Sequence, residues 1–278
     1  MHNKLINTIR SGHWTQTDIN NYNNLLNQIS DGKIIFRRTA QEGRPFSANC
    51  SLAHAGASLI LRRNDGTETP QRRDPLSEYE REAAEGREQE RLIEAWAKAN
   101  DLWLNDYVDP DGNKAATLED LLQSQWIYWN HGSEAEVYIY DSETVLKSIN
   151  LSHVNDNPGN FLDRIALFNN YFPATALEIV GFGRDSLGHF RTIALQRFII
   201  GIELTEAELD DFLRKLPMRD IGAWYETEDR QAQFSDLSTY NILSDKDGNY
   251  IVIDADVAYN TPDRGGEVEF ENRLIKME

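Results

Sequence analysis

Two aspartates and an asparagine near the C-terminus carry the strongest chemical signal in the sequence. Asp236 is followed by Asn241 five residues later, and Asp254 comes thirteen residues after that. This order and spacing are typical of phosphoryl transfer, in which the first carboxylate accepts the proton of the attacking hydroxyl and the other two side chains bind magnesium. The alternative interpretation is an ordinary surface hairpin, since Asp and Asn also stabilise turns.

A β-hairpin is expected to bring two of these residues together. Short apolar runs at 241–243 and 250–253 are rich in β-branched residues, and the Asp247-Gly248 pair between them predicts a tight turn. The ends of paired strands lie side by side, so Asn241 and Asp254 would be close enough to share one cation. Their amide and carboxylate oxygens are the hard ligands that such a cation prefers.

A candidate phosphate-binding loop and a lysine lie upstream. Gly132 and Ser133 form a loop between two predicted strands, and Gly132 would let backbone N–H groups approach a phosphate closely. The second strand, at 143–149, carries Lys147 in an apolar setting, where its ammonium would pair with nucleotide phosphates. A full glycine-rich loop has three glycines, and a single lysine is also common on edge strands. The order of these features along the chain is what supports the interpretation.

From about Glu78 onward, the chain resembles the Ser/Thr/Tyr kinase-like domain of polyvalent proteins, which belong to phages and conjugative elements, including those of Bacteroides-type bacteria. The resemblance is carried by residues 132–138, 145–147, 161–173, 180–182, 194–199 and 236–254. It implies an α+β, protein-kinase-like fold with an antiparallel N-lobe sheet and a minimal helical C-lobe. It also implies transfer of phosphate from ATP, with Mg, to a protein or small-molecule hydroxyl that the sequence does not identify.

The resemblance assigns roles to individual residues. Asp236 would be the catalytic base, Asn241 and Asp254 the metal ligands, and Lys147 the phosphate-binding cation. Asp163 is the only acid on a helix predicted at 160–172, so it would pair with Lys147; the alternative is a carboxylate favoured by the helix dipole. Adenine would meet the backbone of a hinge, and the cofactor-binding set becomes Gly132, Ser133, Lys147, Gln196, Arg197 and Phe198.

Departures from the family pattern leave a second function open. Phe234-Ser235 stand where protein kinases have His-Arg, and Ala255-Asp256 stand where they have Phe-Gly. Asp256 is either an additional metal ligand or a solvated turn residue. Glu134 and Glu136 add negative charge near the expected phosphates, which favours a catalytically weak nucleotide-binding module. An unrelated α+β protein whose hairpin mimics the motif is the third interpretation.

Composition limits the partners and the compartment. The formal net charge is −18 over 278 residues, which argues against binding to nucleic-acid backbones and to anionic membranes. Cys50 is the only cysteine, so an intramolecular disulfide cannot form. The first residues lack the apolar run of a signal peptide, and no apolar stretch approaches the ~20 residues that span a bilayer. A cytoplasmic protein is expected.

The chain divides into two predicted parts. Residues 1–75 form an accessory α+β region without recognisable chemistry. Residues 76–278 form the kinase-like domain, with an N-lobe at about 100–196 and a C-lobe at about 197–278. Two further helices are predicted, one at 77–99 with a capping box from Ser77 and Glu80, and one at 205–216 with a capping box from Thr205 and Glu208.

Overall fold

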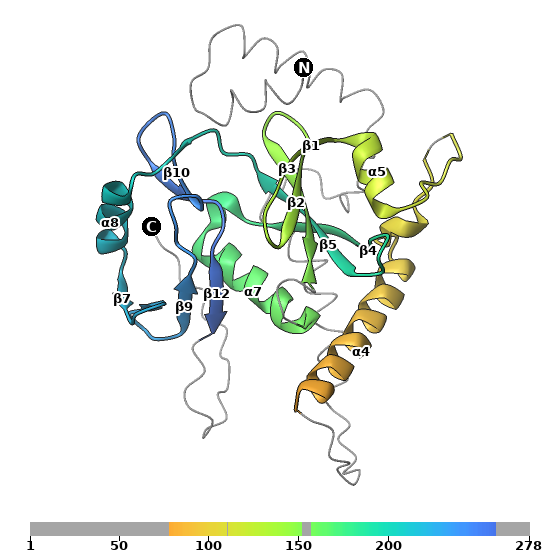
Figure 1. Cartoon of the computed structure of the whole chain (residues 1–278), viewed down its shortest axis with the longest axis horizontal. Coiled ribbons are helices and arrows are strands. Elements are labelled where there is room, and N and C mark those ends of the chain that lie inside the picture. Colours follow the sequence, from red (N-terminus) through yellow and green to blue (C-terminus); the bar gives the residue numbers. More distant parts are fainter. Residues whose placement is uncertain (1–77, 110, 152–156, 260–278) are drawn as a thin grey trace, which may run out of the picture.

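The structure is a computed structural model that describes residues 78–109, 111–151 and 157–259. The predicted accessory region at 1–75 and the Ser77 cap lie outside these ranges. The described part begins with the helix α4 (Glu78–Ala99), continues through a five-stranded sheet, and ends in two smaller sheets (Figure 1).

The expected antiparallel sheet of the N-lobe is present, with strand order β1-β2-β3-β5-β4. Its strands are β1 (Ile127–His131), β2 (Ala135–Ile139), β3 (Thr144–Asn150), β4 (Glu178–Arg184) and β5 (Phe190–Arg197). The central strand β3 is buried at every position except Lys147, which is partly exposed. Side chains alternate between the two faces of a strand. Val145, Lys147 and Ile149 line one cavity, whereas Leu146 belongs to the apolar cluster on the other face.

Two helices cover the cavity side of this sheet. The helix α7 (Pro158–Tyr171) begins after Asn157, whose side chain accepts a hydrogen bond from the Asn160 N–H at 2.9 Å, and it ends before Pro173. The helix α4 packs against α7 and β4, with Ile93 completely buried in the shared core (Figure 1). The α5 helix (Leu118–Gln125) contributes to the apolar cluster on the opposite face. The short 3-10 helices η2 (Leu104–Asp106) and η3 (Pro173–Thr175) complete this part.

In the described part of the predicted C-lobe, strands outnumber helices. Between 197 and 259 there is one α-helix, α8 (Glu206–Lys215), which begins with the predicted Thr205–Glu208 capping box. The rest is β-structure: β6 (Ile202–Glu203), β7 (Met218–Asp220), β8 (Tyr225–Thr227), β9 (Ala232–Ser235), β10 (Ile242–Ser244), β11 (Tyr250–Val252) and β12 (Asp256–Tyr259). The segment between α8 and β9 turns at Gly222, whose φ of 100° favours glycine, and it forms the β7–β8 hairpin.

None of the helices in the described part of the chain combines the length and the apolar composition needed to cross a membrane.

Candidate functional site

Two nested strand pairs assemble the Asp–Asn–Asp residues. The inner pair is the predicted hairpin, in which β10 and β11 run antiparallel with Ile242 opposite Val252. Its turn contains Gly248 at φ 80°, a conformation that favours glycine. The outer pair is β9 with β12, which places Ser235 opposite Asp256.

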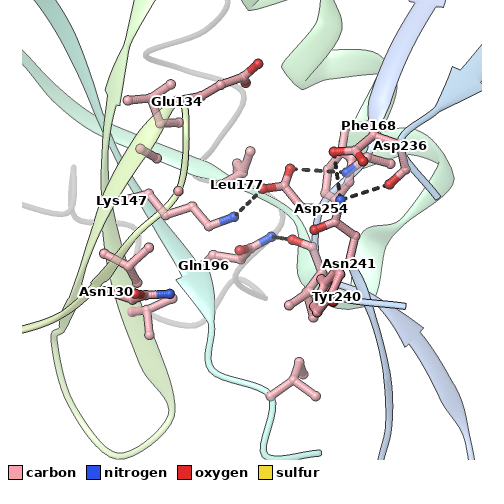
Figure 2. Close-up of a pocket in the computed structure, with 18 of the residues that line it drawn as sticks. Asn130, Glu134, Lys147, Phe168, Leu177, Gln196, Asp236, Tyr240, Asn241 and Asp254 are labelled. Carbon is pink, nitrogen blue, oxygen red and sulfur yellow. Dashed lines mark hydrogen bonds and ion pairs between the residues drawn. The ribbon is translucent and has the colours of Figure 1, made fainter. Parts of the chain in front are cut away.

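The nested pairs bring the three residues to one end of the ladder. Asp236 leaves β9, Asn241 enters β10, and Asp254 lies between β11 and β12. The Asn241 carbonyl accepts hydrogen bonds from the Ile253 N–H at 2.8 Å and from the Asp254 N–H at 3.4 Å. The hairpin prediction is therefore confirmed, and the three polar residues lie together (Figure 2).

Asp236 and Asn241 hold each other in place. The Asn241 side-chain amide donates to the Asp236 carbonyl and to Asp236 Oδ2, both at 2.8 Å (Figure 2). Asp236 has a positive φ of 56°, which is unfavourable for a residue with a Cβ and persists where neighbouring contacts compensate. Because Asn241 donates through Nδ2, its Oδ1 is left to act as an acceptor.

Lys147 meets Asp254 across the cavity. Lys147 Nζ lies 3.4 Å from Asp254 Oδ2; the lysine side chain is 12% exposed and the aspartate side chain 61% exposed. A mostly buried ammonium therefore contacts a carboxylate that is open to ligands (Figure 2).

The structure does not bring Asp163 into this cavity. The α7 residues that line it are Phe161, Arg164, Ile165 and Phe168, which recur at the spacing of one helix face. At 3.6 residues per turn, position 163 lies on the opposite side of the helix. Asp163 is partly buried there, and its pairing with Lys147 stays a prediction.

The cavity lies between the N-lobe sheet and the β9–β12 region and has a volume of about 510 Å³. Gly132 and Ser133 line it from the loop between β1 and β2, and the Gly132 N–H donates to the Ala135 carbonyl at 2.8 Å. A Cβ on Gly132 would approach protein only at the Ala135 carbonyl oxygen, 4.0 Å away. Packing within the protein therefore does not require glycine at this position, whereas a closely approaching ligand would.

The predicted hinge lines one wall of the cavity. The buried Gln196 side chain donates to the Thr175 carbonyl at 2.7 Å and to the Ile253 carbonyl at 3.0 Å. It thus connects β5 to the residue that precedes Asp254. Arg197 also faces the cavity, and Phe198 donates its N–H to the Glu143 carbonyl at 2.7 Å while its ring packs against Trp129. Contact between this backbone and adenine stays a prediction.

Two carboxyl groups of the site, Asp236 and Glu134, have raised pKa values. Burial raises the pKa of Asp236, the hydrogen bond from Asn241 opposes that rise, and the nearby Asp256 and Asp254 add to it. Burial is also the largest cause of the raised pKa of Glu134; Asp256 raises it further, and Arg164 partly offsets the rise. A bound cation would relieve the repulsion between these carboxylates.

Only one of the two glutamates near the loop faces the main cavity. Glu134 lines it, whereas the Glu136 carboxylate accepts a hydrogen bond from the Tyr138 hydroxyl at 2.7 Å and lies 3.6 Å from Arg191. Ala135 and Val137 of β2 also line the cavity, so Glu136 between them lies on the other face of the sheet, whereas Glu134 precedes the strand and belongs to the loop. The negative charge expected at the phosphates from both residues therefore comes from Glu134 alone.

Glu134→Gln should raise the melting temperature at pH 7. A raised pKa means that the folded protein holds extra protons between the ordinary glutamate value, about 4.3, and the raised one, so stability falls as the pH rises through that window. The variant should lose its advantage well below the ordinary glutamate value of about 4.3, where the glutamate is protonated in both states.

Calorimetry at both pH values would measure this effect, with Glu136→Gln as the matched control. Glu136 has an arginine and a hydroxyl as partners, so its substitution should bring no gain in stability. Equal melting temperatures for Glu134→Gln and the unmodified protein at pH 7 would show that the Glu134 charge does not destabilise the folded state.

Reasoning from the sequence missed Arg164 as a charged residue of the cavity. Arg164 forms an ion pair with Asp256, which gives Asp256 a role other than those of metal ligand and solvated turn residue. The signal that could have found Arg164 is the apolar stripe of α7, because Phe161, Ile165 and Phe168 define the face on which position 164 also lies.

The predicted metal ligands suit a magnesium ion. Across the described ranges, no group of three or more His, Cys, Asp or Glu side chains forms a ready metal cage. Magnesium does not need one, since it keeps several waters and binds through one or two carboxylates plus substrate phosphates. Asp254, with its exposed carboxylate, and the Oδ1 of Asn241 are oxygen donors of this kind.

Comparison with known proteins identifies a family. Neither the curated proteins nor the solved structures contain a match to the chain. Residues 86–261 match the family Kinase-PolyVal, described as the serine/threonine/tyrosine kinase found in polyvalent proteins. This range covers the five-stranded sheet, α7 and the nested strand pairs, so the protein belongs to the Kinase-PolyVal family.

Proposed function

We propose that this protein transfers the γ-phosphate of Mg-bound ATP to a hydroxyl group of a protein or a small molecule. The observation that carries the proposal is the convergence of Asp236, Asn241, Asp254 and Lys147 on one cavity. These residues come from separate parts of the chain and match the parts that phosphoryl transfer requires. A kinase family membership over residues 86–261 supports the same reaction class.

Each residue has a defined task in this reaction. Asp236 accepts the proton of the acceptor hydroxyl, and the hydrogen bond from Asn241 to Oδ2 keeps its carboxylate oriented. Lys147 binds the phosphates of the nucleotide in place of its ion pair with Asp254. Asn241 and Asp254 hold magnesium, which neutralises charge on the phosphates when it is bound.

The remaining cavity residues bind the nucleotide. The loop at Gly132 and Ser133 covers the phosphates, and residues 196–198 border the adenine. The apolar side chains of Val145, Phe168 and Leu177 provide the surface that a purine ring requires.

A catalytically weak nucleotide-binding module is the second candidate function. The observation that favours it is Glu134, a partly buried carboxylate in the cavity whose negative charge opposes phosphate binding. Such a module would bind nucleotide, and the bound state would be recognised by a partner, without transfer of phosphate.

Thermal melting and phosphate transfer separate the candidates. Mg-ATP should raise the melting temperature, since a ligand at 100 times its dissociation constant adds ~2.7 kcal/mol to the free energy of unfolding. Radiolabelled γ-phosphate should then appear on the protein itself or on an acceptor in a host lysate. Stabilisation without transfer would favour the binding module, and the absence of any stabilisation at millimolar Mg-ATP would refute both functions.

A further inference from the structure

Two ion pairs tie the N-lobe to one short segment of the chain. Lys147 on β3 meets Asp254, and Arg164 on α7 meets Asp256. A single residue separates the two aspartates. One ion pair therefore attaches the segment at 254–256 to the sheet, and the other attaches it to α7.

The second pair reaches the reactive residues through the β-ladder. Asp256 is the first residue of β12 and lies opposite Ser235, the residue directly before Asp236. Asp254 precedes Asp256 by two residues. The position of Asp256 therefore affects the catalytic base on one side and the metal ligand on the other.

Arg164 is well placed to fix that position. It lies on the cavity face of α7, with its side chain 23% exposed, and its partner Asp256 is 41% exposed. The cavity face of α7 is otherwise apolar, formed by Phe161, Ile165 and Phe168. Partly buried guanidinium–carboxylate contacts have a defined geometry, so this pair can hold the helix at a fixed distance from β12.

The proposed reaction opens one of the two ion pairs and leaves the other closed. Lys147 and Asp254 must exchange their contact for phosphate and metal when nucleotide binds. The Arg164–Asp256 pair has no such exchange to make, because neither residue is needed by the nucleotide in the proposed function. It can therefore keep α7 attached to β12 while the first pair is open.

We propose that Arg164 is a positioning residue for phosphate transfer, acting through Asp256 to keep Asp236 and Asp254 aligned while nucleotide occupies the cavity. The inference rests on the proposed function of this cavity. Its direct rival is that Arg164 itself binds the phosphates, and the two roles predict different kinetics.

The test is a charge exchange. Arg164→Met and Asp256→Asn should each lower kcat by on the order of 10- to 100-fold, the loss that a misplacement of about 1 Å produces, with little change in the KM for ATP. The double variant Arg164→Asp with Asp256→Arg restores an ion pair of similar reach and should recover most of kcat. Arg164→Lys keeps the positive charge, so its kcat should lie between that of Arg164→Met and that of the unmodified protein.

Arg214→Met is the matched control. Arg214 forms an exposed pair with Asp210 on α8, outside the cavity, so its loss should leave kcat unchanged. Melting temperatures of all variants separate a loss of alignment from a loss of folding. If Arg164→Met does not fold, the charge-exchange variant and Arg164→Lys still decide the question.

Two outcomes would overturn the proposal. Unchanged kcat in Arg164→Met would show that the pair has no role. A large rise in the KM for ATP that the charge exchange does not reverse would show that Arg164 binds the phosphates directly.

Failure of the proposed function would look different, since the unmodified protein itself would then transfer no phosphate. In that case hydrogen exchange at the amides of β9 and β12 measures the alignment without catalysis. Arg164→Met should speed hydrogen exchange at these strands, and the double variant Arg164→Asp with Asp256→Arg should restore protection. Hydrogen exchange as slow in Arg164→Met as in the unmodified protein would reject the positioning role.

Discussion

Asp236→Asn should lower phosphate transfer by about two to four orders of magnitude, the usual contribution of general acid–base catalysis. The substitution removes the carboxylate that takes the acceptor's proton and changes the side-chain volume very little. Since Asp236 is assigned to the acceptor hydroxyl, stabilisation by Mg-ATP should persist. Transfer of radiolabelled γ-phosphate and thermal melting measure the two effects on the same samples.

The pH dependence supplies a second readout for Asp236. Burial and the neighbouring Asp256 and Asp254 raise the pKa of its carboxyl, whereas the hydrogen bond from Asn241 lowers it. A base must be ionised to act, so the acid limb of kcat/KM should lie above the ordinary aspartate value of about 3.9.

The control for this prediction is Asp210→Asn on α8, where the carboxylate is 65% exposed and outside the cavity. It should transfer phosphate at the unmodified rate. Equal transfer by Asp236→Asn and the unmodified protein would remove Asp236 from the role of base.

Lys147→Met should abolish most of the stabilisation by Mg-ATP. Methionine keeps the apolar stem of this mostly buried side chain and removes the ammonium that would bind phosphate. Hydrogen bonds to charged groups contribute about 1.5–3 kcal/mol, so the dissociation constant should rise roughly 10- to 100-fold. Isothermal titration with a non-hydrolysable ATP analogue and magnesium would measure it.

Asp254→Asn tests the other side of the same ion pair. It should weaken binding of the nucleotide with magnesium and have much less effect on nucleotide without the ion, because Asp254 is assigned to the metal. Lys215→Met is the control, since Lys215 pairs with Asp211 on the exposed face of α8. If Lys147→Met bound Mg-ATP as tightly as the unmodified protein, the cavity would not be the nucleotide site that we propose.

Much of the site could be predicted because it depends on local sequence. The hairpin that joins Asn241 to Asp254 follows from two β-branched runs and the glycine at 248, and the cap of α8 follows from Thr205 and Glu208. Turn conformation and capping are decided within a few residues. The antiparallel N-lobe sheet also agreed with the resemblance to the kinase-like family, whose membership the comparison confirms.

The C-lobe could not be predicted in the same way. The family resemblance implied a minimal helical C-lobe, and no element was predicted for the segment between α8 and β9. In the structure it forms the hairpin of β7 and β8, which extends the sheet that carries β9 and β12. Pairing with a strand that already exists decided its conformation.

By itself, the sequence determined which residue types were available for phosphate transfer and the local turns that present them. Only the tertiary structure decided which partners they meet. Lys147 lies 107 residues from Asp254 and Arg164 lies 92 residues from Asp256, so both contacts depend on how α7 and the sheet pack on β12. The rotation of α7 about its axis turned Arg164 toward the cavity and Asp163 away from it. That rotation is set by burial of the apolar face of the helix, because a helix orients its apolar stripe toward the core and the charged residues follow.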